Sequence, residues 1–488
     1  MLNALGQIAS KFRARVGESI MTLEKHDMLL AEVTTLLLEA LKAFSAGQKI
    51  LSTSGYAAAI PLFKKAIEID PKFAMAYAWL GRMYGDIGES TLSAENTSKA
   101  YELRDRANDK EKLIISASYD MQVTGNLEKA RQTCEWWVQA YPRAVEPHGF
   151  LAGIIYPALG DYDKSIEEAQ TSVRLNPDFP IGYAILASSY MALDRLSEAE
   201  NTHRQALNRK LEIPDFFYQR YALEFLKGDK AGMEREVTQA REKLGVEDPL
   251  ARFESLALAY SGHLEEATRI LRRDVDVARQ AGRQEMASEF ETDGAIREAL
   301  FGNAAIAREE AIAALKLSKS RDVQYGVALA LAFSGDSFRS QTLTDDLSRR
   351  FPEDTTVRFT AVPTLRAVLA LKHNQSAKSI EWLQTALPYE LGAAASLYPA
   401  FIRGEAYLAE GQSKKAAAEF QKILDHRGIV ISDPIGAVAH LQIGRAYVMQ
   451  GDTAKAKAAY QDFLTLWKDA DPDIPIYKQA KTEYAKLE

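Results

Sequence analysis

An all-α, right-handed superhelical solenoid of about twelve helix-turn-helix repeats is predicted by three features of this sequence. A small turn residue recurs every 33 to 40 positions, capping residues follow many of these turns, and small and large apolar residues alternate at helical spacing between them. This period is typical of stacked helical hairpins, and we expect no β-sheet. The recurring turn residues are Gly88, Gly125, Gly160, Asp194, Gly228, Gly262, Gly302, Gly335, Asn374, Gly411 and Gly451.

Polar residues follow several of these glycines. Gly302 precedes Asn303, and an aspartate follows four other turn glycines, at Asp161, Asp229, Asp336 and Asp452. Glycine suits the left-handed residue that closes a helix, and the next Asp or Asn side chain can cap the helix that follows. Each turn residue is therefore expected inside one hairpin.

The clearest unit begins at Ala74. Tyr77, Leu80, Gly81 and Tyr84 follow at spacings of three or four, which places them on one face of a helix. We expect two helices to cross closely at the glycine, with the larger side chains filling the space around the crossing.

The second helix of the preceding unit shows the complementary pattern. Ala59, Phe63 and Ala66 alternate small and large residues, and Pro71 follows the helix end. Together the two helices resemble the tetratricopeptide repeat (TPR) family, whose unit has 34 residues. The resemblance implies a protein-binding scaffold and covers about twelve units between Ala40 and Asp471.

The quality of the repeat divides the chain into five segments. Each hairpin is expected to bury its apolar face only against its neighbours, so the ends need capping helices. The segments are 1–39 with amphipathic helices at 5–23 and from 28, 40–210 with well-matched repeats, 211–396 with degenerate repeats, 397–471 with repeats again, and 472–488 with a C-terminal capping helix.

A second resemblance covers nearly the whole chain. The stretches 57–64, 88–90, 125–130 and 420–428 look like the C-terminal TPR region of receptor-like serine/threonine protein kinases of bacteria, acidobacterial ones especially. The resemblance implies a regulatory module of a bacterial signalling system, or alternatively the sensor region of a kinase whose catalytic domain is not in this chain. We expect a cytoplasmic protein, or a periplasmic one if it follows a membrane helix in a larger parent.

Composition narrows the function classes. A net charge of −7 argues against nucleic-acid binding, since such surfaces are usually basic. The single cysteine, Cys134, excludes an internal disulfide and a multi-cysteine metal site, and we expect an inert core thiol. No apolar stretch reaches the roughly 18 to 20 residues that a membrane helix needs.

No catalytic or cofactor-binding motif is found. Phosphate-binding glycine loops, the His-Arg-Asp and Asp-Phe-Gly elements of kinases, and an HExxH pair are all absent. Asp469, Asp471 and Asp473 alternate as in a calcium loop, but the loop glycine and the closing glutamate are missing. The prediction is therefore a chain that is not an enzyme, with no cofactor and no metal, and these acids in a solvated connector.

The candidate site is a concave groove lined by the first helices of the repeats. Residues one or four positions off the packing stripe point into it and are mostly apolar, which suits an amphipathic or extended peptide of a partner protein. Alternatively, neighbouring repeats or the N-terminal helices close the groove, and its apolar residues are core. The predicted partner-binding residues are Met75, Arg82, Lys112, Tyr119, Phe150, Ile154, Ile181 and Met191, with Tyr398, Phe401, Leu441 and Arg445 in the C-terminal half.

Overall fold

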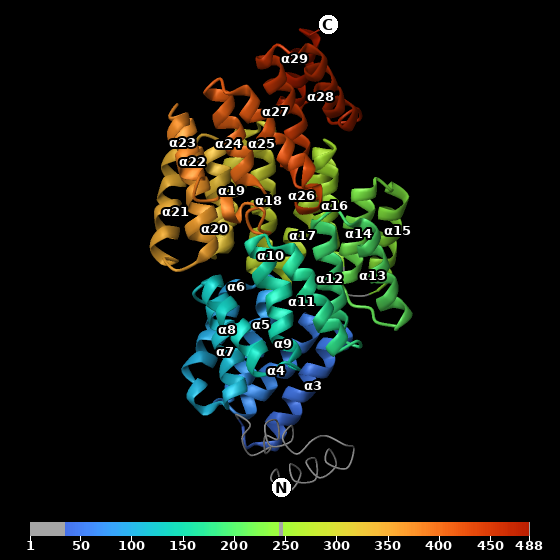
Figure 1. Ribbon diagram of the computed structural model, residues 1–488, viewed down its shortest axis with the longest axis vertical. Helices are drawn as coiled ribbons and strands as arrows, with labels where there is room; N and C mark the ends of the chain where they lie inside the picture. Colours follow the sequence, from blue (N-terminus) through green and yellow to red (C-terminus); the bar gives the residue numbers. More distant parts are fainter. Residues whose placement is uncertain (1–34, 244–246, 488) are drawn as a thin grey trace. The chain divides into compact units, whose positions relative to one another are not determined.

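The computed structural model describes residues 35–243 and 247–487, and all regular structure in these ranges is helical (Figure 1). The described residues pack as two compact units, which are divided between Pro147 and His148. The helix predicted at 5–23 and the start of the one predicted from residue 28 lie outside the described residues. For the described part, the prediction of an all-α helical-repeat fold is confirmed.

The first unit contains helical hairpins in which each helix packs against the next along the chain. Its helices are α3 (Leu38–Ser54), α4 (Tyr56–Ile69), α5 (Ala74–Asp86), α6 (Ser90–Glu102), η2 (Arg104–Arg106), α7 (Asp109–Gln122) and α8 (Leu127–Ala140). Helix α9 (Val145–Phe150) spans the boundary to the second unit.

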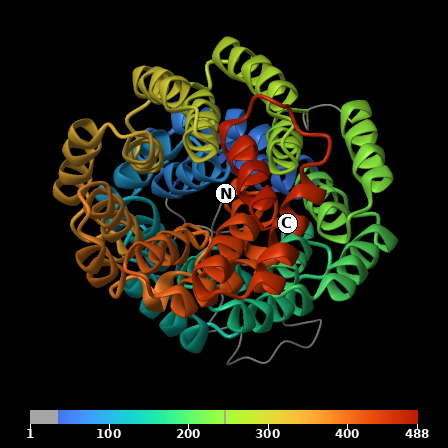
Figure 2. The same cartoon turned by 90° about the horizontal axis from the view of Figure 1, so that it is seen from above.

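Within the second unit the hairpins follow a curved path, which Figure 2 shows passing from green through yellow to orange. Its first part comprises η3 (Leu151–Ile155), α10 (Tyr156–Leu159), α11 (Tyr162–Leu175), α12 (Pro180–Ala192), α13 (Leu196–Asn208), α14 (Asp215–Lys227), α15 (Lys230–Glu242), α16 (Glu247–Tyr260), α17 (Leu264–Gln280), α18 (Gln284–Phe301) and α19 (Ala304–Leu317). Its second part comprises α20 (Arg321–Phe333), α21 (Ser337–Arg350), η4 (Val357–Ala361), α22 (Val362–Lys372), α23 (Ser376–Leu383), η5 (Leu387–Tyr389), α24 (Tyr398–Ala409), α25 (Ser413–Asp425), α26 (Arg427–Val430), α27 (Pro434–Gln450), α28 (Thr453–Leu466) and α29 (Pro475–Ala485).

The periodic turn residues lie inside the hairpins, as predicted. All of them adopt positive φ, from 55° at Asp194 to 96° at Gly302, which is the left-handed region that glycine and, less readily, Asp and Asn accept. The predicted capping helix is present as α29, which buries Ile476 and Ala480. Local backbone chemistry therefore sets where each hairpin turns.

The predicted helix caps form at the four aspartates but not at Asn303. Side chains of Asp161, Asp229, Asp336 and Asp452 each accept a hydrogen bond from the backbone N–H three residues later. The Asn303 side chain makes no such cap, because its amide donates to the Glu298 carboxylate at 2.7 Å instead. A nearby buried acceptor thus replaces the expected local bond.

Close helix crossing at Gly81 is confirmed. A Cβ atom on this residue would lie 2.3 Å from the Thr97 hydroxyl oxygen of α6 and 3.0 Å from the Ser93 carbonyl oxygen, so only glycine fits. Ala59 and Phe63 are fully buried in α4, as the alternation of small and large residues predicts. In the first unit, these residues of the repeat pattern are therefore the ones that pack between helices.

Two first helices contain a π-helical segment that the sequence pattern did not predict. In η3 the backbone N–H of Tyr156 bonds the Leu151 carbonyl, and in η4 the N–H of Val362 bonds the Val357 carbonyl. A proline, Pro157 or Pro363, follows each segment. Proline lacks an N–H and crowds the carbonyl four residues earlier, and the wider π turn accommodates it within a continuous helix.

The expectation that hairpins contact only their neighbours is wrong for the second unit. Its C-terminal repeats return to hairpin turns about 200 residues earlier in the chain. Arg427 donates to the Asp194 carboxylate at 2.9 Å and to the Leu226 carbonyl at 3.0 Å. A Cβ atom on Gly428 would lie 1.8 Å from the Met191 carbonyl oxygen, so this contact between α26 and α12 requires glycine.

The same return continues at the turn around Gly262. The Trp467 indole N–H donates to the Tyr260 carbonyl at 2.9 Å, and the Asp471 N–H donates to the Gly262 carbonyl at 3.0 Å. The Asp471 carboxylate accepts from the Glu265 N–H at 2.7 Å and so caps α17. Asp471, predicted to lie in a solvated connector, instead joins two parts of the unit that are far apart in sequence.

Candidate functional site: a charged cavity in the second unit

The predicted partner-binding residues of the first unit lie on α5 and α7. Met75 is buried, with 4% of its surface exposed, whereas the other three are partly exposed. Arg82 pairs with Asp86 at 2.8 Å and Lys112 with Asp109 at 3.4 Å. The Tyr119 ring stacks on Tyr101 with 4.0 Å between centroids. The partly exposed Arg82, Lys112 and Tyr119 are the side chains that a partner could reach directly.

The predicted residues of the second unit lie on α9, η3 and α12. Phe150, Ile181 and Met191 are buried, and Ile154 in the π segment is partly exposed. In the C-terminal half Tyr398, Phe401 and Leu441 are buried. Arg445 pairs with Glu483 at 2.9 Å. Several of the apolar residues predicted to line a groove are therefore buried.

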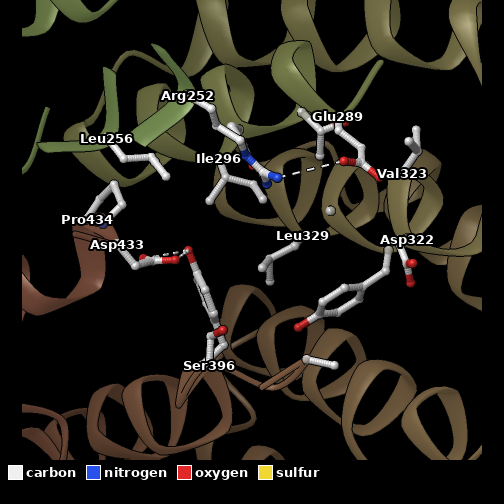
Figure 3. A pocket seen from close by; sticks show the side chains of 16 residues that line it. Arg252, Leu256, Glu289, Ile296, Asp322, Val323, Leu329, Ser396, Asp433 and Pro434 are labelled. Carbon is white, nitrogen blue, oxygen red and sulfur yellow. Dashed lines mark hydrogen bonds and ion pairs between the residues drawn. The ribbon is translucent and has the colours of Figure 1, made fainter. Parts of the chain in front are cut away.

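A cavity of about 340 Å³ lies where the C-terminal repeats of the second unit face the first helices of three earlier hairpins (Figure 3). We call it the inner cavity. Its volume falls within the range of protein ligand sites, which begins near ~300 Å³. Its lining comes from α16 (Arg252, Leu256), α18 (Glu289, Thr292, Asp293, Ile296), α20 (Asp322, Val323, Tyr325, Gly326, Leu329) and a C-terminal wall (Ala394, Ser396, Tyr398, Asp433, Pro434).

Helical periodicity explains why each helix contributes several side chains. Thr292 and Asp293 lie three and four residues after Glu289, and Ile296 lies three residues after Asp293, so these side chains share one face of α18. A Cβ atom on Gly326 of α20 would lie 2.4 Å from the Thr292 methyl group, so the two helices approach closely behind the cavity. The hairpin array thus brings polar faces of successive first helices together.

The two chain segments that carry the C-terminal wall have an unusual backbone. Ser396, Leu397 and Ile431 all have positive φ, at 44°, 61° and 50°. Such conformations are costly for residues with a side chain, and most of all for a β-branched one such as Ile431. Leu397 is fully buried, and burial of this kind holds the strained segment beside Ser396 and Tyr398 in place.

Two acidic side chains compete for Arg252. Its guanidinium makes paired hydrogen bonds to Asp293, from Nε at 2.6 Å and from Nη2 at 3.1 Å. The Glu289 carboxylate lies farther away, at 3.7 Å from the same guanidinium. Burial raises the pKa of Glu289 to about 8, and this single guanidinium offsets only part of that shift.

Asp433 and Asp322 lie on other sides of the cavity. The Tyr398 hydroxyl donates to Asp433 at 3.1 Å, and the Ile435 N–H donates to the same carboxylate at 3.0 Å. Burial nevertheless raises the pKa of Asp433 to about 6. Burial also acts on Asp322, but the neighbouring Arg321 at 2.8 Å outweighs it and lowers the pKa of Asp322. The cavity therefore holds four carboxylates against one lining guanidinium.

The raised pKa of Glu289 should make the protein less stable as pH rises. Between pH 4.5 and about 8 the unfolded chain loses this proton before the folded chain does, so the contribution of Glu289 to stability is fully present below pH 4.5 and is lost by about pH 8. Urea-induced unfolding measures this effect. Between pH 5 and 8.5 we expect the free energy of unfolding to fall by ~1–3 kcal/mol less in Glu289→Gln than in wild type. Exposed Glu309→Gln on α19 should follow wild type. Parallel curves for Glu289→Gln and wild type would contradict the raised pKa.

Sequence reasoning found one cavity residue, Tyr398, and missed the charged ones. Arg252, Glu289, Asp293 and Asp322 lie in the degenerate segment 211–396, where the repeat pattern is poorest. One feature of the sequence could have indicated these residues. Glu289 and Asp293 are four residues apart and therefore place two negative charges on one face of a first helix. Without the C-terminal wall, however, such a face is indistinguishable from a solvated one.

Two stretches of the chain match models of a known repeat family. Tetratricopeptide repeat family models match residues 62–94 and 438–470, so the chain contains such repeats in both units. No curated protein matches the sequence.

Among solved structures, yeast Tom70 is 16% identical and covers 92% of this chain and 95% of its own, with a TM-score of 0.33. The P58(IPK) TPR domain is 12% identical, covers 92% of this chain and 98% of its own, and has a TM-score of 0.23. The Cut9-Hcn1 structure of the APC/C is 13% identical, covers 96% of this chain and 99% of its own, and has a TM-score of 0.35.

The described residues offer neither a cluster of metal ligands nor a membrane-spanning helix. In residues 35–243 and 247–487 no group of three or more His, Cys, Asp or Glu side chains is placed to hold a metal ion. None of the helices in those ranges is both long and apolar enough to cross a membrane.

Proposed function

We propose that this protein is a non-catalytic scaffold that binds a peptide segment of a partner protein on the inner faces of its repeats. The proposal rests on the inner cavity, which is formed by first helices of helical hairpins and lined by charged, aromatic and apolar side chains. Sites that bind ligands typically combine apolar walls with a few polar groups that fix the orientation of the ligand.

The residues predicted from sequence extend this proposal to other first helices. Arg82, Lys112 and Tyr119 in the first unit and Ile154 in the second are partly exposed. We propose that the residues of each unit contact a partner protein on their own unit. Met75, Phe150, Ile181 and Met191 have buried side chains, so we do not propose direct contact with the partner for them.

A steric block of the inner cavity should test the proposal. Ala394 lines the cavity and is exposed, whereas its exposed neighbour Ala393 is not part of the lining. We expect peptides selected on the full chain from a random phage-displayed library to bind Ala394→Trp at least ~10-fold more weakly than wild type, as loss of a well-packed anchor would require. Binding to Ala393→Trp should be unchanged.

The result that overturns the proposal is equally specific. If selection yields no peptide above background, or if both tryptophan variants bind the selected peptides as wild type does, the inner cavity is not a peptide site. Calorimetric unfolding of both variants would verify that each remains folded.

The second candidate is a regulatory region of a bacterial signalling kinase. It rests on the resemblance of the stretches 57–64 and 420–428 to repeat regions of receptor-like kinases. The coding sequence next to this chain tests it: an in-frame kinase segment upstream supports the candidate, and an unrelated gene there argues for a free scaffold. The same sequence would decide between the proposed cytoplasmic location and a periplasmic one.

A further inference from the structure

We infer that the inner cavity binds the cationic side chain of a lysine or arginine in the partner segment. This inference rests on the proposed scaffold function and specifies what its cavity recognises. The geometry that points to it is the encirclement of one space by Glu289, Asp293, Asp322 and Asp433, as Figure 3 shows for the labelled three of these side chains.

The four carboxylates of the cavity differ in how closely a cation is paired with them. Asp293 holds Arg252 through two hydrogen bonds, and Asp322 is paired with Arg321. Glu289 shares Arg252 at the longer distance of 3.7 Å, and the hydrogen bonds that Asp433 accepts from the described residues come from neutral donors, Tyr398 and Ile435. A second cation in the cavity would therefore find two carboxylates that are incompletely neutralised.

Apolar side chains define the shape of this cation. Leu256, Ile296, Val323 and Leu329 line the same space as the carboxylates. Lysine and arginine combine an apolar stem with a charged head, so one such side chain can contact both kinds of lining. The rings of Tyr325 and Tyr398 also belong to the lining and provide faces that attract cations.

The arrangement does not suit a metal ion. Within the described ranges no three acidic, histidine or cysteine side chains converge tightly enough to coordinate one. The carboxylates instead surround a volume of about 340 Å³ from three helices and the C-terminal wall. An extended organic cation matches this spacing, and an ion about the size of a water molecule does not.

Proton release should accompany binding. Glu289 is faced by Arg252 from α16, by Glu285 and Asp293 from α18 and by Asp322 from α20, and its pKa lies near 8 in the free protein. A bound cation favours the ionised carboxylate, so binding below pH 8 expels a proton. Affinity should therefore rise with pH.

Asp433 belongs to the same titration. It is faced by Tyr398 from α24, by Arg252 from α16 and by Asp293 from α18, and its pKa lies near 6. Between pH 6 and 9 the ionisation of Glu289 dominates, and we expect affinity for the cation to increase roughly 10-fold or more.

The test uses short peptides with the full chain. Acetylated, amidated pentapeptides carry arginine, norleucine or glutamate at the centre and glycine elsewhere, and spermidine serves as a free amine. Binding is followed by NMR titration and by calorimetry in two buffers of different ionisation enthalpy. The variants are Glu289→Gln and Asp433→Asn, with Glu309→Gln on the outside of α19 as a control of equal charge.

The arginine peptide should bind more tightly than the norleucine and glutamate peptides and release a proton at pH 7. Glu289→Gln should weaken it at least ~5-fold and abolish the proton release, whereas Glu309→Gln should change neither. Equal binding of the norleucine peptide, or unchanged binding by Glu289→Gln, overturns the inference. Spermidine that binds where the arginine peptide does not overturns the assignment to a side chain.

These outcomes separate the inference from the proposed function. If Ala394→Trp blocks library-selected peptides but Glu289→Gln and Asp433→Asn bind them as wild type does, the scaffold function stands and the cation site does not. If Ala394→Trp has no effect on the selected peptides, the proposed function fails regardless of the charge variants.

Discussion

Replacement of Trp467 by alanine should lower the free energy of unfolding by ~3–5 kcal/mol, as expected for removal of a fully buried tryptophan. The ring packs edge-on against Phe301 with 5.0 Å between centroids and lies 4.8 Å from Phe463. The substitution also leaves the Tyr260 carbonyl without its indole donor. Chemical denaturation measures the loss.

Trp136 provides the matched control, because 56% of its surface is exposed. Trp136→Ala should change the free energy of unfolding by less than ~0.5 kcal/mol. Hydrogen exchange gives a second readout for Trp467→Ala: residues 258–268 should exchange faster although they are about 200 positions away in sequence. Faster exchange confined to residues near the substitution would contradict the return of the C-terminal repeats.

Arg403→Met should destabilise the protein by a similar amount, ~3–5 kcal/mol, because it removes the cation from a buried ion network. Arg403 is 1% exposed and donates to Glu390 at 2.7 Å and to Glu419 at 2.6 Å. Lys422 contacts the same two carboxylates at 2.8 and 3.2 Å, but its side chain is 29% exposed. Lysine alone would leave Glu390 incompletely compensated.

Arg349→Met is the control for this prediction. Arg349 also pairs with an acid, Asp346, but its side chain is 78% exposed. Solvent screens such pairs, so the expected change is below ~1 kcal/mol. Urea denaturation of both variants decides the matter, and equal losses would show that burial of the Arg403 network contributes nothing.

Much of the fold could be predicted because its determinants are local. The turn residues from Gly88 to Gly451 require positive φ, and the aspartates beside them cap the next helix. The close crossing at Gly81 could be predicted because its contact, Thr97, is only 16 positions away in the same hairpin. Short-range sterics and hydrogen bonds of this kind repeat with the period of the sequence.

The candidate site was predicted only in part. Met75, Phe150, Ile181 and Met191 occupy the predicted first helices, but their side chains are buried. Repeat spacing locates a helix face to within a residue or two, and a residue at the edge of that face can point either to a groove or to the next hairpin. Periodicity alone could not separate these alternatives.

The sequence by itself determined the helical hairpins, their turns and the small-residue crossings, because these depend on residues close together in the chain. Only the tertiary structure decided that Gly428 meets Met191, that Asp471 caps α17, and that Asp433 faces Glu289 across one cavity. These contacts depend on the accumulated curvature of several hairpins. A small rotation between each hairpin and the next adds up over about 200 residues. The repeat pattern describes a single hairpin and therefore does not predict the total rotation.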